Sequence, residues 1–449
     1  MRVPLKILRR TSTFGLTLAF GFILVFIFFL PTPTKQPKLS DETETYPGFA
    51  LEEDATMELC DQLPILEPDG STLPETPLNE QTCLARYGRN LVEIQNNIIT
   101  FGSWLNDEEK SSVNCVYSTV EMENDLKIKF LNRKPIEKIP AHCPSPVFNV
   151  TCTYQPRDLA FYRQVSYVFR CYGHDFKEPT KHWKQEKLNV VMIGLDSLAR
   201  VAWYDQLPKT VTFIEDHPSS FIMNGYNVIG DGTTAALLAL LTGYQDYELP
   251  EARRGFEKAQ HIDGFPFIWN ALKQQSKYVT LYDEDQPSIG TFQHRLMGFK
   301  TKPVDYYGRP FQLACKEAIP KFFDCLGGNS TFEEMLNQVD TLFQLHPFDP
   351  KFSLIFNGAF SRPLFDGSQD VSNLDDMFVD ALRRWEQKGF FNNTVFILFS
   401  DHGARNGRNR ATPRGKLEER MPMMSLILPQ WFLQQNPEAK GALKVLLNL

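Results

Sequence analysis

Six short apolar runs recur in the second half of the sequence, each about as long as a buried β-strand. The first, Asn189–Leu195, is a continuous apolar run. A run of this length suits a strand buried on both faces and is too short for a stable helix. The other five runs are Phe221–Ile229, Tyr278–Tyr282, Phe352–Phe356, Thr394–Phe399 and Met423–Leu428.

Helical patterns lie between several of these runs, at Thr234–Leu241, Phe265–Gln275 and Leu374–Lys388. Alternating buried strands and helices are typical of an α/β fold with a mainly parallel sheet. We therefore predict an α/β/α sandwich over residues 187–449. Ligands of such sheets bind beyond the carboxyl ends of the strands, so the polar residues that end these runs are the candidates for a site.

The N-terminal region has the features of an uncleaved membrane anchor. Phe14–Leu30 is almost wholly apolar, and with its flanking threonines it is long enough for a spanning helix, which needs about 20 residues. Bulky side chains end the stretch where a signal peptidase needs small ones. Four basic residues precede it and keep the N-terminus cytosolic. We predict a cytosolic tail at 1–12 and a signal anchor at 13–33, with a cleaved signal peptide as the alternative.

The cysteines and the glycosylation sequons agree with this placement. All 8 cysteines follow the predicted span, and none has C-x-x-C spacing, so disulfides in an oxidising compartment are expected rather than a zinc ribbon. Pairing cannot be read from the sequence, although Cys315 and Cys325 are plausible local partners. Sequons at Asn149, Asn329 and Asn392 also follow the span. Together these features predict a single-pass type II membrane glycoprotein of the secretory pathway or cell surface.

Composition divides the lumenal chain into three parts. Residues 34–80 are rich in Pro, Thr, Asp and Glu and are expected to form a stalk. Residues 81–186 hold five of the cysteines and short alternating segments, which indicates a small disulfide-tied module of mostly β or irregular structure. The third part is the predicted α/β domain. The net charge of −7 offers no basic face for nucleic acid.

Polar residues at three of the run ends form a candidate site. Asp196 follows the first run, where its carboxylate can hold a cation. Capping of the next helix by Asp196 would explain its position equally well. Thr233 precedes the helical string AALLALLTG, where an anion is favoured; its hydroxyl is either a nucleophile for a phosphoryl or sulfuryl ester or a simple cap. Asp401 and His402 end the fifth run and offer an oxygen and a nitrogen to a divalent metal, although a turn would also explain them.

Longer strings around these residues resemble the alkaline-phosphatase-like superfamily, which includes sulfatases, nucleotide pyrophosphatases and phosphoethanolamine transferases. More closely, they are similar to the family catalogued as Domain of Unknown Function 229. The strings are NVVMIGLDSLAR, GDGTTAALLALLTG, YDEDQPSIGTFQHRLMGF and ILFSDHGARNGRNRATPRGKLEERMPMMSLILP. The resemblance implies the alkaline-phosphatase-like fold from about Leu188 and extends weakly through the cysteine-bearing module.

The resemblance also implies roles for individual residues. Thr233 aligns with the nucleophilic Cys or Ser of sulfatases and the Thr of pyrophosphatases. Asp196, Asp401 and His402 match the ligands of the metal that binds the nucleophile oxygen, which would lower the hydroxyl pKa and shield the ester during in-line attack. Arg420 matches the Arg of an Arg-Val-Pro string and is expected either to face substrate or to pair with a nearby carboxylate. The implied metal is zinc, and oxygen-rich ligation also suits calcium, magnesium or manganese.

Departures from the family pattern narrow the chemistry. Thr233 cannot become the formylglycine of sulfatases, and Leu237 stands where their signature has Arg. The second metal of two-zinc relatives needs an Asp-x-x-x-His and a further His, but no such motif follows Thr233 and no His follows His402. The chain also ends at Leu449, where relatives continue, which indicates a shortened paralogue or an incomplete chain.

These observations predict a membrane-anchored phosphate-ester hydrolase or transferase that uses Thr233 and one divalent metal. The alternative is a catalytically degenerate ectodomain with a binding or structural role, and a lesser alternative is a sulfatase-like hydrolase. Glu284 and Asp285 lie in one of the family strings and are expected either to approach the site or, as acidic loop residues usually are, to be solvated. The arginines of 405–414 are expected either to recognise an anionic substrate or to form a solvated basic loop.

Overall fold

The computed structural model describes residues 83, 88–154, 163–172, 187–319, 325–361, 371–405 and 408–447. The predicted tail, anchor and stalk lie outside these residues, as does Cys60. Within the described ranges, no helix combines the length and the apolar character needed to cross a membrane.

A seven-stranded sheet forms the centre of the α/β region, in the strand order β10-β17-β16-β9-β15-β11-β12. Every neighbouring pair from β16 to β12 is parallel, whereas β17 runs antiparallel to both β16 and β10. The structure thus confirms an α/β fold with a mainly parallel, mixed sheet. The strands are β9 (Asn189–Leu195), β10 (Ser220–Ile222), β11 (Val279–Glu284), β12 (Tyr306–Tyr307), β15 (Lys351–Asn357), β16 (Thr394–Phe399) and β17 (Met424–Ile427).

One predicted strand is much shorter than expected. The run Phe221–Ile229 was predicted to be extended throughout, but β10 ends at Ile222. Asn224 and Gly225 form a turn that takes the chain out of the sheet. Ile229 is exposed rather than buried, so the apolar pattern here belongs partly to a loop that leads to the candidate site.

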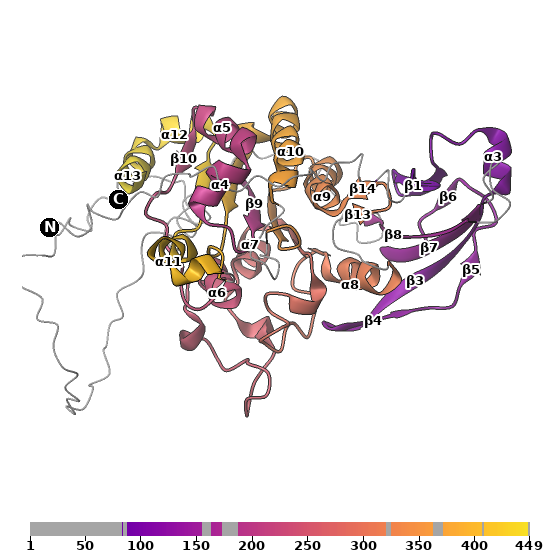
Figure 1. The fold of residues 1–449 in the computed structure, drawn as a ribbon, viewed down its shortest axis with the longest axis horizontal. Coiled ribbons are helices and arrows are strands. Elements are labelled where there is room, and N and C mark those ends of the chain that lie inside the picture. The colour runs from indigo at the N-terminus through magenta and orange to yellow at the C-terminus, as the bar shows by residue number, and fades with distance from the viewer. Residues whose placement is uncertain are drawn as a thin grey trace, which may run out of the picture.

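Helices cover both faces of the sheet and produce three layers. Because side chains alternate along a strand, Val190 and Met192 of β9 enter one core, while Val191 and Ile193 enter the other. In Figure 1, α4, α5 and α10 lie above β9, and α6 and α7 lie below it. The first core includes α6 (Thr233–Thr242), α7 (Ile268–Ser276), α12 (Gln430–Gln435) and α13 (Pro437–Leu447); the second includes α4 (Arg200–Gln206), α5 (Pro208–Asp216), α9 (Thr331–Leu345) and α10 (Asp375–Gln387).

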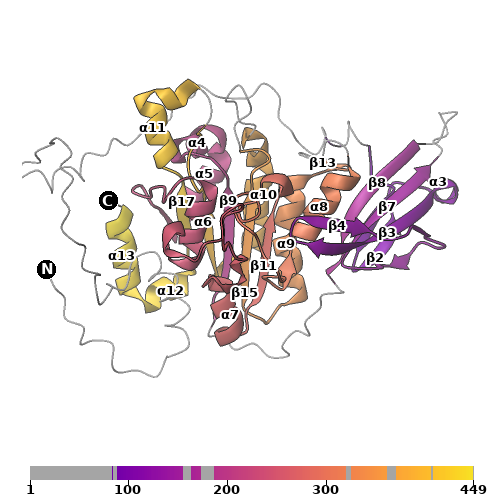
Figure 2. The ribbon, with the colours of Figure 1, turned by 90° about the horizontal axis from the view of Figure 1, so that it is seen from below.

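The cysteine-bearing module is a β structure at one end of the molecule, drawn in indigo and violet in Figures 1 and 2. Its larger sheet has five strands and its smaller sheet has three. Helix α8 (Arg309–Ala318) of the α/β region packs against the larger sheet through a shared apolar cluster. The strands are β1 (Val92–Gln95), β2 (Ile98–Phe101), β3 (Asn114–Asn124), β4 (Lys127–Phe130), β5 (Lys134–Pro135), β6 (Ala141–His142), β7 (Val147–Tyr154) and β8 (Arg163–Arg170), with the helix α3 (Asp107–Ser112) between β2 and β3.

The turn between β3 and β4 is inserted into the α/β region. Its carboxylate, Asp125, is buried and accepts hydrogen bonds from the Gln293 amide at 2.7 Å, the Phe299 backbone N–H at 2.9 Å and the Tyr307 hydroxyl at 2.7 Å. The guanidinium of Arg309, also buried, lies 3.7 Å from the same carboxylate. This hairpin tip therefore joins the two parts of the molecule through a polar contact buried away from water.

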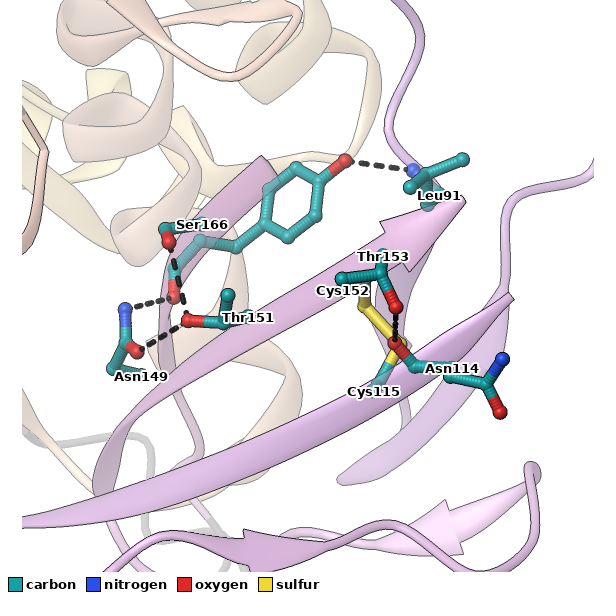
Figure 3. The surroundings of a disulfide bond; sticks show 9 residues. Leu91, Asn114, Cys115, Asn149, Thr151, Cys152, Thr153 and Ser166 are labelled. Carbon is teal, nitrogen blue, oxygen red and sulfur yellow. Dashed lines mark hydrogen bonds between the residues drawn. A yellow bond between two sulfur atoms is a disulfide. The ribbon is translucent and has the colours of Figure 1, made fainter. Parts of the chain in front are cut away.

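Three disulfides connect six of the seven described cysteines. Cys115–Cys152 joins β3 to β7, as Figure 3 shows, and Cys143–Cys171 closes a second loop of the module. The predicted pairing of Cys315 with Cys325 is wrong, since Cys325 is bonded to Cys83, 242 residues earlier. Cys315 is a buried free thiol on α8, inside the apolar cluster that faces the larger β sheet, whereas Cys325 lies on the short strand β13 (Cys325–Leu326).

Candidate active site

The three predicted metal ligands meet at the carboxyl edge of the sheet. Because β9 and β16 are neighbouring parallel strands, Asp196 after β9 comes next to Asp401 and His402 after β16. One ligand atom from each residue lies within 4.8 Å of the other two. The exposed fractions of the three residues are 1%, 1% and 4%, so the cluster is shielded from solvent.

Hydrogen bonds orient the members of this cluster. Asp401 Oδ1 accepts from the backbone N–H groups of Ser197 and His402, both at 2.9 Å, and Asp196 Oδ1 accepts from the Ser197 hydroxyl at 2.5 Å. His402 Nδ1 donates to the Gly403 carbonyl oxygen at 2.7 Å. The other ring nitrogen, Nε2, lies 3.3 Å from Asp401 Oδ2 and 4.0 Å from Asp196 Oδ1.

The chemistry of the cluster fits a divalent cation. Burial raises the pKa of Asp401, and the nearby Asp196 carboxylate raises it further against the opposing effect of His402. Asp401 Oδ2 is buried and accepts no hydrogen bond from the part of the chain that the structure describes. A buried carboxylate oxygen that accepts no hydrogen bond is costly, and a cation held between two carboxylates and an imidazole nitrogen would remove that cost. The donor set suits zinc or manganese.

Thr233 is the first residue of α6 and faces this cluster. Its Oγ1 lies 3.4 Å from His402 Nε2. The adjacent Thr234 points elsewhere, because its hydroxyl donates to the Thr291 carbonyl oxygen at 2.8 Å. Gly232, just before the helix, has a φ of 84°, and a Cβ there would collide with the Arg405 guanidinium. The glycine thus permits the turn that aims the Thr233 hydroxyl at the cluster.

A hollow of about 250 Å³ opens beside the cluster and is rich in arginine. Arg405 forms ion pairs with Asp231 and, at 3.2 Å, with Glu419; the first contact lowers the pKa of Asp231. Arg420, the last residue of α11 (Pro413–Arg420), is exposed at this hollow and forms no ion pair with any described residue. The lining residues are Val228, Gly230, Asp231, Gly232, His402, Arg405, Arg410, Glu419 and Arg420.

Glu284 and Asp285 are buried rather than solvated. Glu284 is the last residue of β11, and its carboxylate accepts hydrogen bonds from the backbone N–H and hydroxyl of Thr291, both at 2.7 Å. Asp285 accepts from the Asn357 amide and the Gly358 N–H, both at 2.7 Å. These contacts support the loops beside the site. Apart from Asp196, Asp401 and His402, the described ranges bring no three potential metal ligands this close together.

The three sequons lie in different surroundings. Asn149 is buried in β7, and its side-chain amide donates to the Tyr167 carbonyl oxygen at 3.0 Å while its Oδ1 accepts from Thr151 (Figure 3). A glycan on that nitrogen has no path to solvent, so the geometry argues against Asn149 as an acceptor. Asn329 is half-buried and donates to Glu334, whereas Asn392 is exposed. Glycosylation at these two positions stays a prediction.

Fold and site together define a class: an α/β protein with a buried Asp–Asp–His cluster beside a threonine at a helix start. The chain belongs to the family described as Protein of unknown function (DUF229), whose model matches residues 77–447. Among curated proteins, none matches this chain.

Several solved structures share part of the backbone arrangement. A Vibrio parahaemolyticus protein in the alkaline phosphatase superfamily is 18% identical, with a TM-score of 0.38 over 56% of this chain. The zinc complex of the C-terminal periplasmic domain of EcEptC from Escherichia coli is 13% identical, with a TM-score of 0.38 over 56% of this chain and 75% of that one. The lipoteichoic acid synthase LtaP from Listeria monocytogenes is 12% identical, with a TM-score of 0.36 over 54% of this chain and 66% of that one. The match spans 62% of the Vibrio protein.

Proposed function

We propose that this chain is a metal-dependent phosphate-ester hydrolase or transferase with Thr233 as its nucleophile. The observation that carries the proposal is the 3.4 Å approach of Thr233 Oγ1 to His402 Nε2, the nitrogen that faces both aspartates of the cluster. A hydroxyl at a helix start, beside a buried metal-binding set and an arginine-rich hollow, supports nucleophilic attack on an anionic ester.

In the first step, Thr233 Oγ1 forms a bond to phosphorus as the bond from phosphorus to the alcohol oxygen breaks. The hydroxyl proton passes to solvent, and the departing alkoxide takes a proton from water. The product is a phosphothreonine, whose phosphoryl group then passes to water or to an acceptor alcohol as the bond between phosphorus and Thr233 Oγ1 breaks and the hydroxyl is restored. A divalent cation held by Asp196, Asp401 and His402 would supply the positive charge that lowers the hydroxyl pKa and offsets the charge of the ester.

The arginines beside the cluster have different roles in this proposal. Arg405 is already paired with Asp231 and Glu419, so it mainly fixes the loop before Thr233. Arg420 is exposed at the same hollow without an ion pair among the described residues, and it is the guanidinium available to an oxygen of the substrate phosphate.

We also propose that the protein is anchored in a membrane by residues 13–33, with its N-terminus in the cytosol. The site would then lie in the secretory pathway or outside the cell. Three disulfides in the described part support an oxidising compartment, since such bonds are rare in the cytosol.

The test combines metal content with covalent labelling of the purified full chain. The protein is loaded with zinc or manganese, incubated with p-nitrophenyl phosphate or its bis ester, and examined by mass spectrometry for phosphothreonine. We expect one metal per chain and a label on Thr233. Thr233→Ala should keep the metal and lose the label, Asp401→Ala should lose both, and the matched control Thr212→Ala, whose exposed hydroxyl donates to the Pro208 carbonyl oxygen, should keep both.

The outcomes separate the candidate functions. A label that persists in Thr233→Ala, or a folded wild type that binds no metal, contradicts the proposal. Metal without label or turnover favours the second candidate, a catalytically degenerate binding ectodomain. The observation on its side is that the described residues contain one metal-binding cluster, whereas two-metal relatives use two.

A further inference from the structure

A second hollow, of about 340 Å³, lies on the other side of the loop that precedes α6. We call it the α6 hollow. Its lining residues are Asp231, Thr234, Ala235, Leu238, Asp246, Tyr247, Leu249, Pro250, Glu251, Ala252, Arg253, Phe265, Arg295 and Leu296. The volume is within the range of small-molecule sites, which is about 300–1,000 Å³.

The interior of the α6 hollow is apolar, and its charges stand at the rim. Its buried lining residues all have apolar side chains: Ala235, Leu238, Ala252, Phe265 and Leu296. Four of the five charged lining residues, Asp231, Asp246, Arg253 and Arg295, are exposed, and the fifth, Glu251, is half-buried and forms an ion pair with Arg253. A ligand that enters must therefore place apolar surface against the floor and keep its charge near the mouth.

Most of the exposed large hydrophobic residues come from the chain segment that forms this hollow, and one of them lines it. Of the seven exposed large hydrophobic residues among those described, four lie between residues 229 and 256: Ile229, Tyr244, Tyr247 and Phe256. Tyr247 lines the hollow and is 75% exposed. Exposed apolar groups that gather at a hollow mark a binding surface more often than single ones do.

The α6 hollow and the candidate active site share a lining residue and include neighbouring residues of the chain. Asp231 lines both this hollow and the arginine-rich one beside His402. Thr234, in its wall, is the residue after Thr233. The Arg295 guanidinium donates to the Asp231 carbonyl oxygen at 3.2 Å and adds positive charge where the two hollows meet.

We infer that the α6 hollow binds the organic group of the phosphate ester, and that this group is an apolar aryl or alkyl group. The inference rests on the proposed function, which puts the phosphate at Thr233. An apolar group would bury itself against Leu238, Phe265 and Leu296, which is favourable, whereas a sugar would press hydroxyls against carbon without hydrogen-bond partners. The substrate class is thus a phosphate ester of a hydrophobic alcohol.

The test compares two phosphonates, which are non-hydrolysable stand-ins for phosphate esters. Titration calorimetry on the metal-loaded full chain should show benzylphosphonate binding about tenfold more tightly than methylphosphonate, because only the benzyl group has apolar area to bury. Leu249→Trp, which fills the hollow, should reduce benzylphosphonate to the affinity of methylphosphonate. The matched control is Leu326→Trp, a half-buried leucine that lines a different hollow of about 530 Å³ near Asn329, and it should leave both affinities unchanged.

If Leu249→Trp does not fold, Leu249→Ala replaces it and should weaken benzylphosphonate about threefold without affecting methylphosphonate, since it removes part of the apolar wall. Equal affinities for the two phosphonates in the wild type overturn the inference and leave the proposed function standing. A wild type that binds metal but neither phosphonate overturns the anion site itself, and with it both proposals.

Discussion

Replacing Asp125 with alanine tests how the cysteine-bearing module is held against the α/β region. The change leaves three donors, on Gln293, Phe299 and Tyr307, without their carboxylate acceptor. It also leaves the buried guanidinium of Arg309 without the negative charge that lies 3.7 Å from it. Removing one partner of a buried ion pair costs about 3–5 kcal/mol. Burial raises the pKa of Asp125, whereas Arg309 lowers it. The cost of burying the carboxylate therefore offsets part of its attraction to Arg309, and we expect Asp125→Ala to lower the free energy of unfolding by about 3 kcal/mol.

The assay is urea unfolding of the full chain with its disulfides intact, with tryptophan fluorescence as the signal that reports unfolding. Asp125→Asn keeps the shape and one acceptor oxygen, and its loss should be smaller than that of Asp125→Ala. The control is Asp107→Ala, whose carboxylate is 99% exposed and pairs, among the described residues, only with Lys110, so the expected loss is about 0.5 kcal/mol or less. If Asp125→Ala lowers the free energy of unfolding no more than this control does, the hairpin tip is not held as we argue.

Three further predictions concern other parts of the chain. Burial lowers the pKa of Lys351, which is 2% exposed, to about 8. Lys351→Met should therefore raise the free energy of unfolding by about 3 kcal/mol at pH 7. This gain should shrink between about pH 8 and 10.5, because over that range the folded lysine loses its proton and the wild type recovers stability. An equal gain at pH 7 and pH 10 in urea unfolding would contradict this. Gly232→Ala should abolish labelling of Thr233 because of the positive φ, whereas Gly264→Ala, which has open space around it, should leave labelling intact in the same mass-spectrometric assay. Asn149→Gln should leave the glycan mass of the secretory-expressed protein unchanged, and Asn392→Gln should lower it; a mass loss in the first variant would show that β7 is not buried during glycosylation.

The part of the fold that local patterns predict is the sheet and the cluster at its edge. Apolar runs such as Asn189–Leu195 and Thr394–Phe399 match β9 and β16 closely, because burial on both faces leaves a continuous signal in the sequence. Once two strands are parallel neighbours, the residues that follow them must meet at one edge. Asp196 and the Asp401–His402 pair could thus be placed together without coordinates.

Long-range contacts account for what the patterns could not predict. The bond between Cys83 and Cys325 depends on how the module packs against the α/β region, which no local spacing records. The sequence around Asp125 is that of an ordinary hairpin turn. Its carboxylate is buried because Gln293 and Tyr307, far away in the sequence, pack against it. The burial of Glu284 similarly depends on the Thr291 loop folding back over the end of β11.

The Cys83–Cys325 bond has a mechanical consequence. Chain upstream of residue 83 is covalently joined to the α/β region as well as to the module that follows it in sequence. If the upstream segment is tethered to a bilayer, a pull on that tether reaches the α/β region directly and bypasses the β sheets in between. Reduction of this single bond would instead transmit the force through the β sheets of the module.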